Sequence, residues 1–507
     1  MPSRHGAPRR IPRWLGVLGL VALGLGGPLI YVFGSPAYSS GDEAAHVDYA
    51  LQLWQGRLPV FEDGLVLANT MGVHPPVQWT AQHPPLFYLL LAPVVGPLVD
   101  AGHIVGAAIG ARLVVAGLAV ALLFAVRWTT SRIFPGRPAV AWAAALITGL
   151  SVWFVRLGGS VYNDVLAAVV VCLAFGMLVA MFREPHRRRW YLGFTLFITL
   201  AALTRFSALP LCALLLTAFL IQRLTVSRPG FWRAVGAPVL SGVVMVLGSA
   251  WFYLRNVALT GNLSGGHPDW ATEHTGRGAR PLLKVAGDPD FWKTMLQQFS
   301  TRTVPEQPWA WWMNWGIPIL FLLPVAVGGV IWLRRIAVTR TPTDVDTIAP
   351  TARRSDVAAP DRSGESRGTE MIVFGVIVLA CLGVAAMQIS HTAGAGSSLP
   401  RYFFALVPFL APVMALALVT GRAAAIALLG WVVIRSTLMG VETSAMLARR
   451  FSGEQAAIWP GLTWAGYVLA LAGAAALVVT ILIARHPRFQ HTRPSAEFRA
   501  LLSDGTP

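Results

Sequence analysis

Hydrophobic residues occur in uninterrupted runs of about 20 along most of the chain, which is the length a helix needs to cross the hydrocarbon core of a bilayer. The first run extends from Trp14 to Phe33 and follows an arginine-rich segment. It is longer than the apolar part of a cleavable signal peptide, so we expect a retained span whose N-terminus lies inside. Further runs are centred on 103–126, 138–155, 161–182, 190–206, 207–222, 234–253, 316–333, 371–390, 402–420, 423–440 and 460–484. The pattern predicts an all-α polytopic membrane protein with about twelve transmembrane helices.

One apolar segment, 84–99, is interrupted by four prolines: Pro84, Pro85, Pro93 and Pro97. If it crossed the membrane, the basic loops 127–137 and 183–189 would lie outside. If it does not cross, most of the 40 lysines and arginines fall on the inside, as the positive-inside rule requires. We therefore expect an interfacial or re-entrant piece on the outer face, with interfacial helices in the first outer loop.

Composition supports this interpretation, because 55% of the 507 residues are hydrophobic and only 12% are charged. Soluble chains carry about 25% charged residues. The net charge of +17 comes from short basic loops between apolar segments, so it does not indicate a nucleic-acid partner. The three cysteines lie inside apolar runs and offer no metal or disulfide motif. No P-loop, GxGxxG motif at a strand–helix junction or HExxH motif is present.

The runs divide the chain into an expected N-terminal transmembrane region, 1–335, and C-terminal transmembrane helices, 370–484. Large outer loops are expected at 34–102 and 254–315. Polar residues fill 336–369, which we expect to be a disordered cytoplasmic loop, and 485–507 is expected to be a cytoplasmic tail.

Candidate chemistry begins just after the first span, at Asp42 and Glu43. Ser39 or Ser40 can cap a helix whose first turn then carries both carboxylates. Helical spacing would place Asp42, His46 and Tyr49 on one face. The alternative is that two acids at a helix start are merely favourable helix chemistry. Glu43-x-x-His46 also has metal-ligand spacing, but the second copy that di-metal carboxylate bundles need is absent from the sequence.

Asp164 is a second acidic candidate, at a junction between two spans on the expected outer side. A carboxylate so close to hydrocarbon is a functional hypothesis by default, and the alternative is an N-cap role for Asn163 or Asp164. Arg205, Arg255 and Arg401 lie on the same expected side. Each could be a snorkelling anchor, but together they place guanidinium groups, which bind phosphate well, near the carboxylates.

Two aromatic motifs also belong to this side. Trp309, Trp311, Trp312 and Trp315 could stack on sugar rings, although an interfacial belt is the commoner role of such a cluster. The segment His83-Pro84-Pro85-Leu86-Phe87-Tyr88 interrupts regular helix at the outer interface. Acidic and basic candidates thus converge on one membrane surface without a nucleotide site. A reaction there would need a donor that arrives within the membrane.

These motifs resemble the GT-C glycosyltransferases, in particular the branch of protein O-mannosyltransferases and bacterial aminoarabinose transferases. The resemblance covers roughly residues 10–410. It rests on Asp42-Glu43-x-x-His46, Gly56-Arg57-Leu58-Pro59, His83-Pro84-Pro85-Leu86-Phe87-Tyr88, Asn163-Asp164, Leu203-Thr204-Arg205, Trp251-x-x-x-Arg255-Asn256 and Arg401-Tyr402, in this order.

The resemblance implies an inverting transfer of a sugar from a polyprenyl-phosphate donor to an extracytoplasmic acceptor, which is a glycolipid, cell-wall glycan or protein. It implies that Asp42 is the general base, that Glu43 assists it and that Asp164 positions acceptor or base. The implied substrate- and phosphate-binding residues are His46, His83, Tyr88, Arg205, Arg255, Asn256, Arg401 and Tyr402.

The alternative function is a multi-span transporter or flippase of lipid-linked sugars. A transporter would place charges at mid-membrane, whereas the candidates here collect at one surface. We expect a multi-pass plasma-membrane protein with both termini cytoplasmic and the active site extracytoplasmic. No cofactor or metal ligand is assigned, although the outer carboxylates could hold a divalent cation.

Overall fold

The computed structural model describes residues 13–68, 72–296, 316–338, 362–421, 423–448 and 458–485. Within these ranges the regular structure is entirely helical, in agreement with the predicted fold class. The α-helices are α1 (Arg13–Gly34), α2 (Gly41–Trp54), α3 (Leu86–Asp100), α4 (Ile104–Ile133), α5 (Pro138–Gly149), α6 (Val152–Gly158), α7 (Asp164–Arg183), α8 (Arg188–Ala202), α9 (Leu209–Gln222), α10 (Phe231–Thr260), α11 (Pro268–Thr275), α12 (Leu282–Ala286), α13 (Pro289–Leu296), α14 (Ile317–Val338), α15 (Arg362–Ala393), α16 (Val407–Val419), α17 (Ala424–Leu447) and α18 (Pro460–Arg485).

Ten helices in the described ranges are long and apolar enough to cross a membrane. The count rises to eleven if α5 and α6, which are bent by 64° at a short break, form one span. The expected span at 190–206 corresponds largely to α8, which has only 15 residues. The polytopic fold is therefore confirmed, and the count of about twelve stays a prediction.

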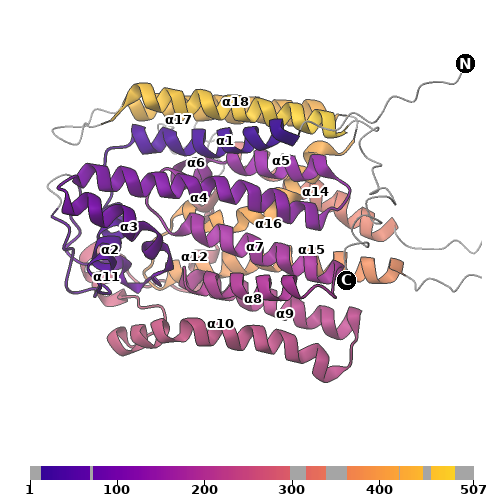
Figure 1. Ribbon diagram of the computed structural model, residues 1–507, viewed down its shortest axis with the longest axis horizontal. Helices are drawn as coiled ribbons and strands as arrows, with labels where there is room; N and C mark the ends of the chain where they lie inside the picture. Colours follow the sequence, from indigo (N-terminus) through magenta and orange to yellow (C-terminus); the bar gives the residue numbers. More distant parts are fainter. Residues whose placement is uncertain are drawn as a thin grey trace, which may run out of the picture.

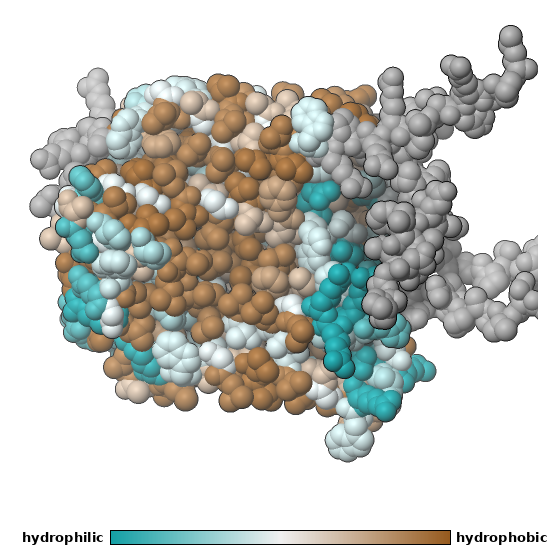
Figure 2. All heavy atoms as spheres, viewed as in Figure 1, coloured by the Kyte–Doolittle hydropathy of each residue, from teal (hydrophilic) through white to brown (hydrophobic). Residues whose placement is uncertain are grey.

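Figure 1 shows the long helices running side by side along one axis, with α2, α3 and α11 gathered at one end of the bundle. We call this the α2–α3 end. On the face shown in Figure 2, hydrophobic residues fill the broad middle zone, and hydrophilic residues lie toward both ends. Such a belt is the surface that a bilayer-spanning bundle presents to lipid.

The first and last described spans, α1 and α18, pack closely against each other. The backbone N–H of Trp459, next to the start of α18, donates to the carbonyl of Phe33 at the end of α1 (2.8 Å), so the two helices are antiparallel. Glycines lie at the interface: Gly26 contacts the backbone of Ala470, and Gly473 contacts that of Leu23. Small residues let membrane helices approach this closely, which increases their van der Waals contact.

The apolar segment rich in proline forms the short helix α3, and Pro93 and Pro97 lie within it. Its 15 residues would extend about 22 Å, less than the roughly 30 Å of a hydrocarbon core. It packs between α2 and α4 at the α2–α3 end. The length agrees with the interfacial interpretation of this segment and with the expected helices in the first outer loop.

Two of the expected loops contain helices. The expected disordered loop 336–369 is helical at its two ends, where α14 continues to Val338 and α15 begins at Arg362, and 339–361 lies outside the described residues. The loop 254–315 contains the short helices α11, α12 and α13. The tryptophans of its 309–315 segment and the tail beyond Arg485 also lie outside the described residues.

Candidate active site

The helix α2 brings the first carboxylates to the α2–α3 end. Its N-cap is Ser40, whose hydroxyl accepts a hydrogen bond from the backbone N–H of Glu43 (3.2 Å), so the predicted cap is confirmed. Asp42 and Glu43 occupy the first turn, where the helix dipole favours negative charge. Although they are adjacent in sequence, their side chains meet different partners.

Asp42 forms an ion pair with Arg401, from the 3-10 helix Pro400–Leu406, with 2.8 Å between Oδ2 and Nη2. The guanidinium of Arg401 also lies 4.4 Å from the ring centre of Tyr162. The Asp42 side chain is 31% exposed and that of Arg401 only 13%. Asp42 is thus the more accessible member of the pair, as a carboxylate that must meet a substrate should be.

Asp164 lies at the start of α7 and forms an ion pair with Arg205. Asn163 is at the N-cap position but makes no capping hydrogen bond with its side chain. Instead its Oδ1 accepts a hydrogen bond from Arg205 (3.1 Å), and its Nδ2 donates to the carbonyl of Thr204 (3.3 Å). Asn163 and Asp164 together hold the guanidinium of Arg205, so a capping role for Asn163 is the weaker interpretation.

The two ion pairs belong to one cluster, because both guanidinium groups lie beside the ring of Tyr402. Arg205 is 5.6 Å from its centre and Arg401 is 5.4 Å. Two carboxylates and two guanidinium groups thus converge from α2, α7, the α8–α9 connection and the segment before α16. We call Asp42, Asp164, Arg205 and Arg401 the charged cluster.

An aromatic layer formed by His46, Tyr49, His83, Tyr88 and Tyr162 lies beside the charged cluster. His46 Nδ1 and Tyr88 Oη are 2.9 Å apart, the rings of Tyr49 and Tyr88 stack at 3.7 Å, and His46 meets Tyr162 edge to face at 5.5 Å. Burial, followed by the positive charges of Arg401 and Arg205, holds the pKa of His46 well below its usual value. His46 is therefore a neutral hydrogen-bonding group.

The expected common face of α2 is present in the structure. His46 and Tyr49 both contact Tyr88, and Asp42 reaches the same layer through Arg401 and Tyr162. The hydroxyl of Tyr49 donates to the carbonyl of His83 (2.9 Å), which fixes the start of the proline-rich segment against α2. Burial also raises the pKa of Tyr162 to about 12, so this phenol stays protonated at neutral pH.

Glu43 turns away from the charged cluster and forms a buried, two-pronged ion pair with Arg112 of α4 (2.6 and 2.7 Å). Its Oε2 also accepts from the backbone N–H of Tyr38 (2.9 Å), a residue in the left-handed region at φ 59°. Arg112 donates further to the carbonyls of Val32, Ser35 and Pro36. The pair therefore secures the turn between α1 and α2, and the strain of a left-handed tyrosine is offset by these contacts.

Arg255 and Asn256 were expected near phosphate, but the structure places them on the first loop. Arg255 donates to the carbonyl of Pro59 (2.6 Å), and Asn256 donates to that of Gln82 (3.2 Å). These contacts connect the end of α10 to the first loop at Pro59 and at Gln82, the residue before His83 of the aromatic layer. Both residues hold the loop in place, and neither has a contact to the charged cluster among the bonds of the described residues.

Metal-ligand spacing at Glu43-x-x-His46 does not become a metal site in this arrangement, because Glu43 meets Arg112 and His46 meets Tyr88. Across the described part of the chain, no group of three or more His, Cys, Asp or Glu side chains is placed to hold a metal ion. A divalent cation stays an untested expectation for this protein.

Sequence reasoning missed several residues of this region. Arg112 lies inside the apolar run 103–126 and was given no role, although an ionisable residue within a span is itself a signal of function. Tyr162 gave no signal apart from its position next to Asn163. Arg435, which was also given no role, lies in the middle of α17, where it is buried and donates to the carbonyl of Leu150 (2.9 Å).

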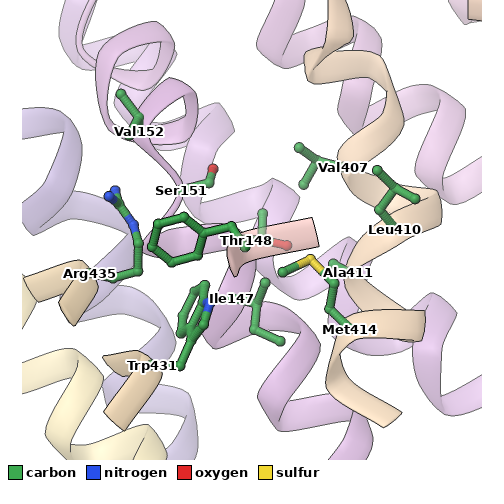
Figure 3. Close-up of a pocket in the computed structure, with 11 residues that line it drawn as sticks. Ile147, Thr148, Ser151, Val152, Val407, Leu410, Ala411, Met414, Trp431 and Arg435 are labelled. Atoms are coloured by element: carbon green, nitrogen blue, oxygen red, sulfur yellow. The ribbon is translucent and has the colours of Figure 1, made fainter. Parts of the chain in front are cut away.

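Arg435 borders a small cavity between α5, α16 and α17, shown in Figure 3. Its volume of about 30 Å³ has room for one or two waters, and its other walls are mainly apolar side chains such as Ile147, Leu410 and Met414. This cavity is too small for a sugar. A much larger cavity of about 500 Å³ lies next to Glu43 and Tyr162.

Comparisons with known proteins give similarities among solved structures alone. No family model and no curated protein matches the sequence. The chain is similar to ArnT from Cupriavidus metallidurans bound to undecaprenyl phosphate, with 14% identity, a TM-score of 0.43, and 92% of this chain and 76% of that chain covered. It is also similar to the oligosaccharyltransferase of Archaeoglobus fulgidus, with 14% identity, a TM-score of 0.43, and 97% and 58% covered. For the arabinosyltransferase EmbB of Mycobacterium smegmatis the values are 14%, 0.42, 99% and 44%.

The chain thus spans 58% and 44% of the oligosaccharyltransferase and the arabinosyltransferase. These neighbours are glycosyltransferases of the kind that the sequence motifs resemble. At such low identities and TM-scores, however, a function for this chain must be argued from its own residues.

Proposed function

We propose that this protein is an integral membrane glycosyltransferase that moves a sugar from a polyprenyl-phosphate donor to an acceptor hydroxyl on the extracytoplasmic face. The observation that carries the proposal is the charged cluster, in which two carboxylates and two guanidinium groups meet at one end of a transmembrane bundle. A donor of this type presents an anionic phosphate at the membrane surface, and planar guanidinium groups bind phosphate with two parallel hydrogen bonds.

In the proposed step, the acceptor oxygen attacks the anomeric carbon of the donor sugar, and the bond between that carbon and the phosphate oxygen breaks. The proton of the acceptor hydroxyl goes to Asp42, and the bonding electrons leave with the polyprenyl phosphate. A positioned carboxylate base contributes typically 10²–10⁴-fold in rate. A single displacement of this kind inverts the anomeric configuration.

Arg401 links donor binding to the activation of this base. Its guanidinium forms an ion pair with Asp42. An incoming phosphate would compete for the same guanidinium, and so would release the carboxylate to accept a proton as the leaving group becomes more anionic. Arg205, held by Asn163 and Asp164, is the second phosphate ligand in this proposal.

Glu43, His46, His83 and Tyr88 act on the reaction by positioning. Glu43 holds the α1–α2 turn through Arg112, and so fixes the first turn of α2 that carries Asp42. The neutral imidazole of His46 and the phenol of Tyr88 form a rigid hydrogen-bonded wall. His83 completes the wall by lying parallel to His46, with 6.1 Å between ring centres.

Sugar transfer in isolated membranes supplied with radiolabelled polyprenyl-phosphate sugars tests the proposal. We expect Asp42→Asn to lower the rate by at least about 10²-fold at equal protein level. The matched control is Asp63→Asn, which alters an exposed carboxylate of the same loop and should transfer at the wild-type rate. Equal transfer by wild type and Asp42→Asn would remove Asp42 from the mechanism.

Repeating the assay with EDTA tests whether a divalent cation takes part. A flippase would instead move labelled donor across proteoliposome membranes with no chemical change. Transport without transfer, unaffected by Asp42→Asn, would favour that alternative.

A further inference from the structure

The cavity of about 500 Å³ beside the charged cluster is lined by a distinctive set of side chains. Its volume lies within the range of about 300–1,000 Å³ that is typical of small-molecule sites. Its walls come from the end of α1, the start of α2, α6 with the turn that follows it, and the last turns of α17. Six of the lining residues carry hydroxyl groups: Tyr31, Ser35, Ser39, Ser40, Ser160 and Tyr162.

Two buried polar atoms at this cavity have no hydrogen-bond partner in the described structure. One is the donor Nε1 of Trp153, and the other is the acceptor Oε1 of Glu442, whose residue is only 6% exposed. Buried polar groups are normally paired, since an unpaired one costs free energy. Arg156 also lines the cavity: it donates to the hydroxyl of Tyr31 (2.6 Å) and packs 5.4 Å from the ring centre of Trp153.

This lining fits a neutral polyhydroxylated ring. Hydroxyl groups can both donate and accept, the unpaired donor and acceptor can each take one sugar hydroxyl, and the indole offers an apolar face. An acyl or prenyl chain would offer no partner to Nε1 of Trp153 or to Oε1 of Glu442. The charged side chains that line the cavity are Arg112, Arg156, Glu43 and Glu442, so the lining carries no net positive charge that would favour an anionic headgroup.

The cavity and the charged cluster share one wall. Tyr162 lines the cavity, and the same ring lies against Arg401, the partner of Asp42. Its hydroxyl is 3.5 Å from that of Ser40, the residue that caps the helix carrying Asp42. A sugar in the cavity is therefore separated from the proposed base by a single side chain.

We propose that this cavity binds one sugar ring of the acceptor, while the part of the acceptor that carries the reacting hydroxyl group extends past Tyr162 to Asp42, so that the acceptor is a glycan or glycolipid. This inference rests on the proposed function and deepens it. The phosphate-binding arginines lie on the other side of Tyr162, where the donor would enter. Trp153, Arg156 and Glu442 select the acceptor.

Binding of methyl hexosides and methyl pentosides to the purified protein in lipid nanodiscs tests the inference by saturation-transfer difference NMR. We expect at least one glycoside to bind with a dissociation constant of about 1–10 mM. Trp153→Ala and the isosteric Glu442→Gln should each weaken it by about tenfold or more. The matched control is Trp464→Ala, which removes a 39% exposed tryptophan of α18.

The source of the sugar is decided by adding the polyprenyl-phosphate sugar donor. A glycoside that stays bound supports the acceptor assignment, and one that is displaced overturns it in favour of the donor sugar. Absence of binding for every glycoside, or equal binding by wild type and both cavity variants, also overturns the inference. Trp153→Phe keeps an aromatic ring and removes the indole N–H. Thermal unfolding of each variant shows whether it folds.

Failure of this inference can be told apart from failure of the proposed function. Asp42→Asn should lose transfer but bind the glycoside as wild type does, because Asp42 does not line the cavity. Trp153→Ala should raise KM for the acceptor while the affinity for the donor stays unchanged. A protein that binds glycosides but transfers no sugar would retain the cavity site and lose the proposed reaction.

Discussion

Asp42 and Glu43 show how adjacent carboxylates acquire different tasks from their surroundings. One faces Arg401 at an accessible surface, and the other is buried against Arg112 with the carbonyls of the α1–α2 turn around it. Their sequence position predicts that both lie in the first turn of a helix, which is confirmed. Their partners come from 69 or more residues away, and no local pattern contains that information.

Breaking the Glu43–Arg112 pair should destabilise the protein far more than changing Asp42. A buried ion pair that loses one partner leaves an uncompensated charge, at a cost of about 3–5 kcal/mol. Arg112→Met should cost more than Glu43→Gln, because it also strips hydrogen bonds from the carbonyls of Val32, Ser35 and Pro36. Thermal unfolding in detergent measures this, with Asp42→Asn as the control that should unfold near the wild-type temperature. Equal unfolding temperatures for Glu43→Gln and Asp42→Asn would contradict the prediction.

His46 should make the stability of the protein depend on pH. Its pKa in the folded state is well below the unfolded value of about 6.5, so the unfolded state binds the proton more readily. Stability is then fully present above about pH 6.5 and falls as the pH drops below it, by up to about 1.4 kcal/mol per pH unit. Unfolding temperatures between pH 7.5 and 5 should fall less steeply for His46→Gln than for wild type. An unchanged slope in the variant would show that His46 is not responsible.

At the scale of elements, hydrophobic length predicts where most helices lie and fails where a helix breaks. The apolar run 138–155 suggests one span, yet the chain forms α5 and α6 at 64° to each other. Ser151 caps α6 by accepting from the backbone N–H of Phe154 (3.3 Å), and the carbonyl of Leu150 accepts from Arg435. The bend therefore depends on a buried arginine of a distant helix, which periodicity within the run does not reveal.

The glycine contacts between α1 and α18 should be sensitive to added volume. A side chain at Gly26 or Gly473 would collide with the backbone of the partner helix, so Gly26→Leu and Gly473→Leu should each destabilise the protein by about 1–3 kcal/mol or more. Gly117 of α4 has open space around it, and Gly117→Leu is the matched control. Unfolding temperatures in detergent and protein yields of the three variants measure the effect. If Gly117→Leu lowers the unfolding temperature as much, the destabilisation comes from replacing a helical glycine in general and not from the contact between α1 and α18.

For the whole molecule, the candidate residues that come together do so at one end of the bundle. The charged cluster, the aromatic layer and the larger cavity all adjoin α2. The loop 184–187 connects α7 to α8. Arg435 is the exception, since it lies in the middle of α17. Its hydrogen bond to Leu150 gives it a structural partner, so a mid-membrane charge does not by itself favour a transporter here.

The sidedness of the bundle is the prediction on which the extracytoplasmic reaction depends. By the positive-inside rule we expect the arginine-rich loop after α7 to lie in the cytoplasm and the first loop, with Asp63, to lie outside. In a variant without native cysteines, Asp63→Cys should react with a membrane-impermeant thiol reagent in intact cells. Arg187→Cys should react after permeabilisation alone; both positions are exposed, which makes them a matched pair. The reverse pattern would place the charged cluster in the cytoplasm, where the proposed acceptors would have to be cytoplasmic. Labelling of both positions in intact cells would mean that an even number of crossings separates the two loops, and α3 would then have to be a span rather than an interfacial helix.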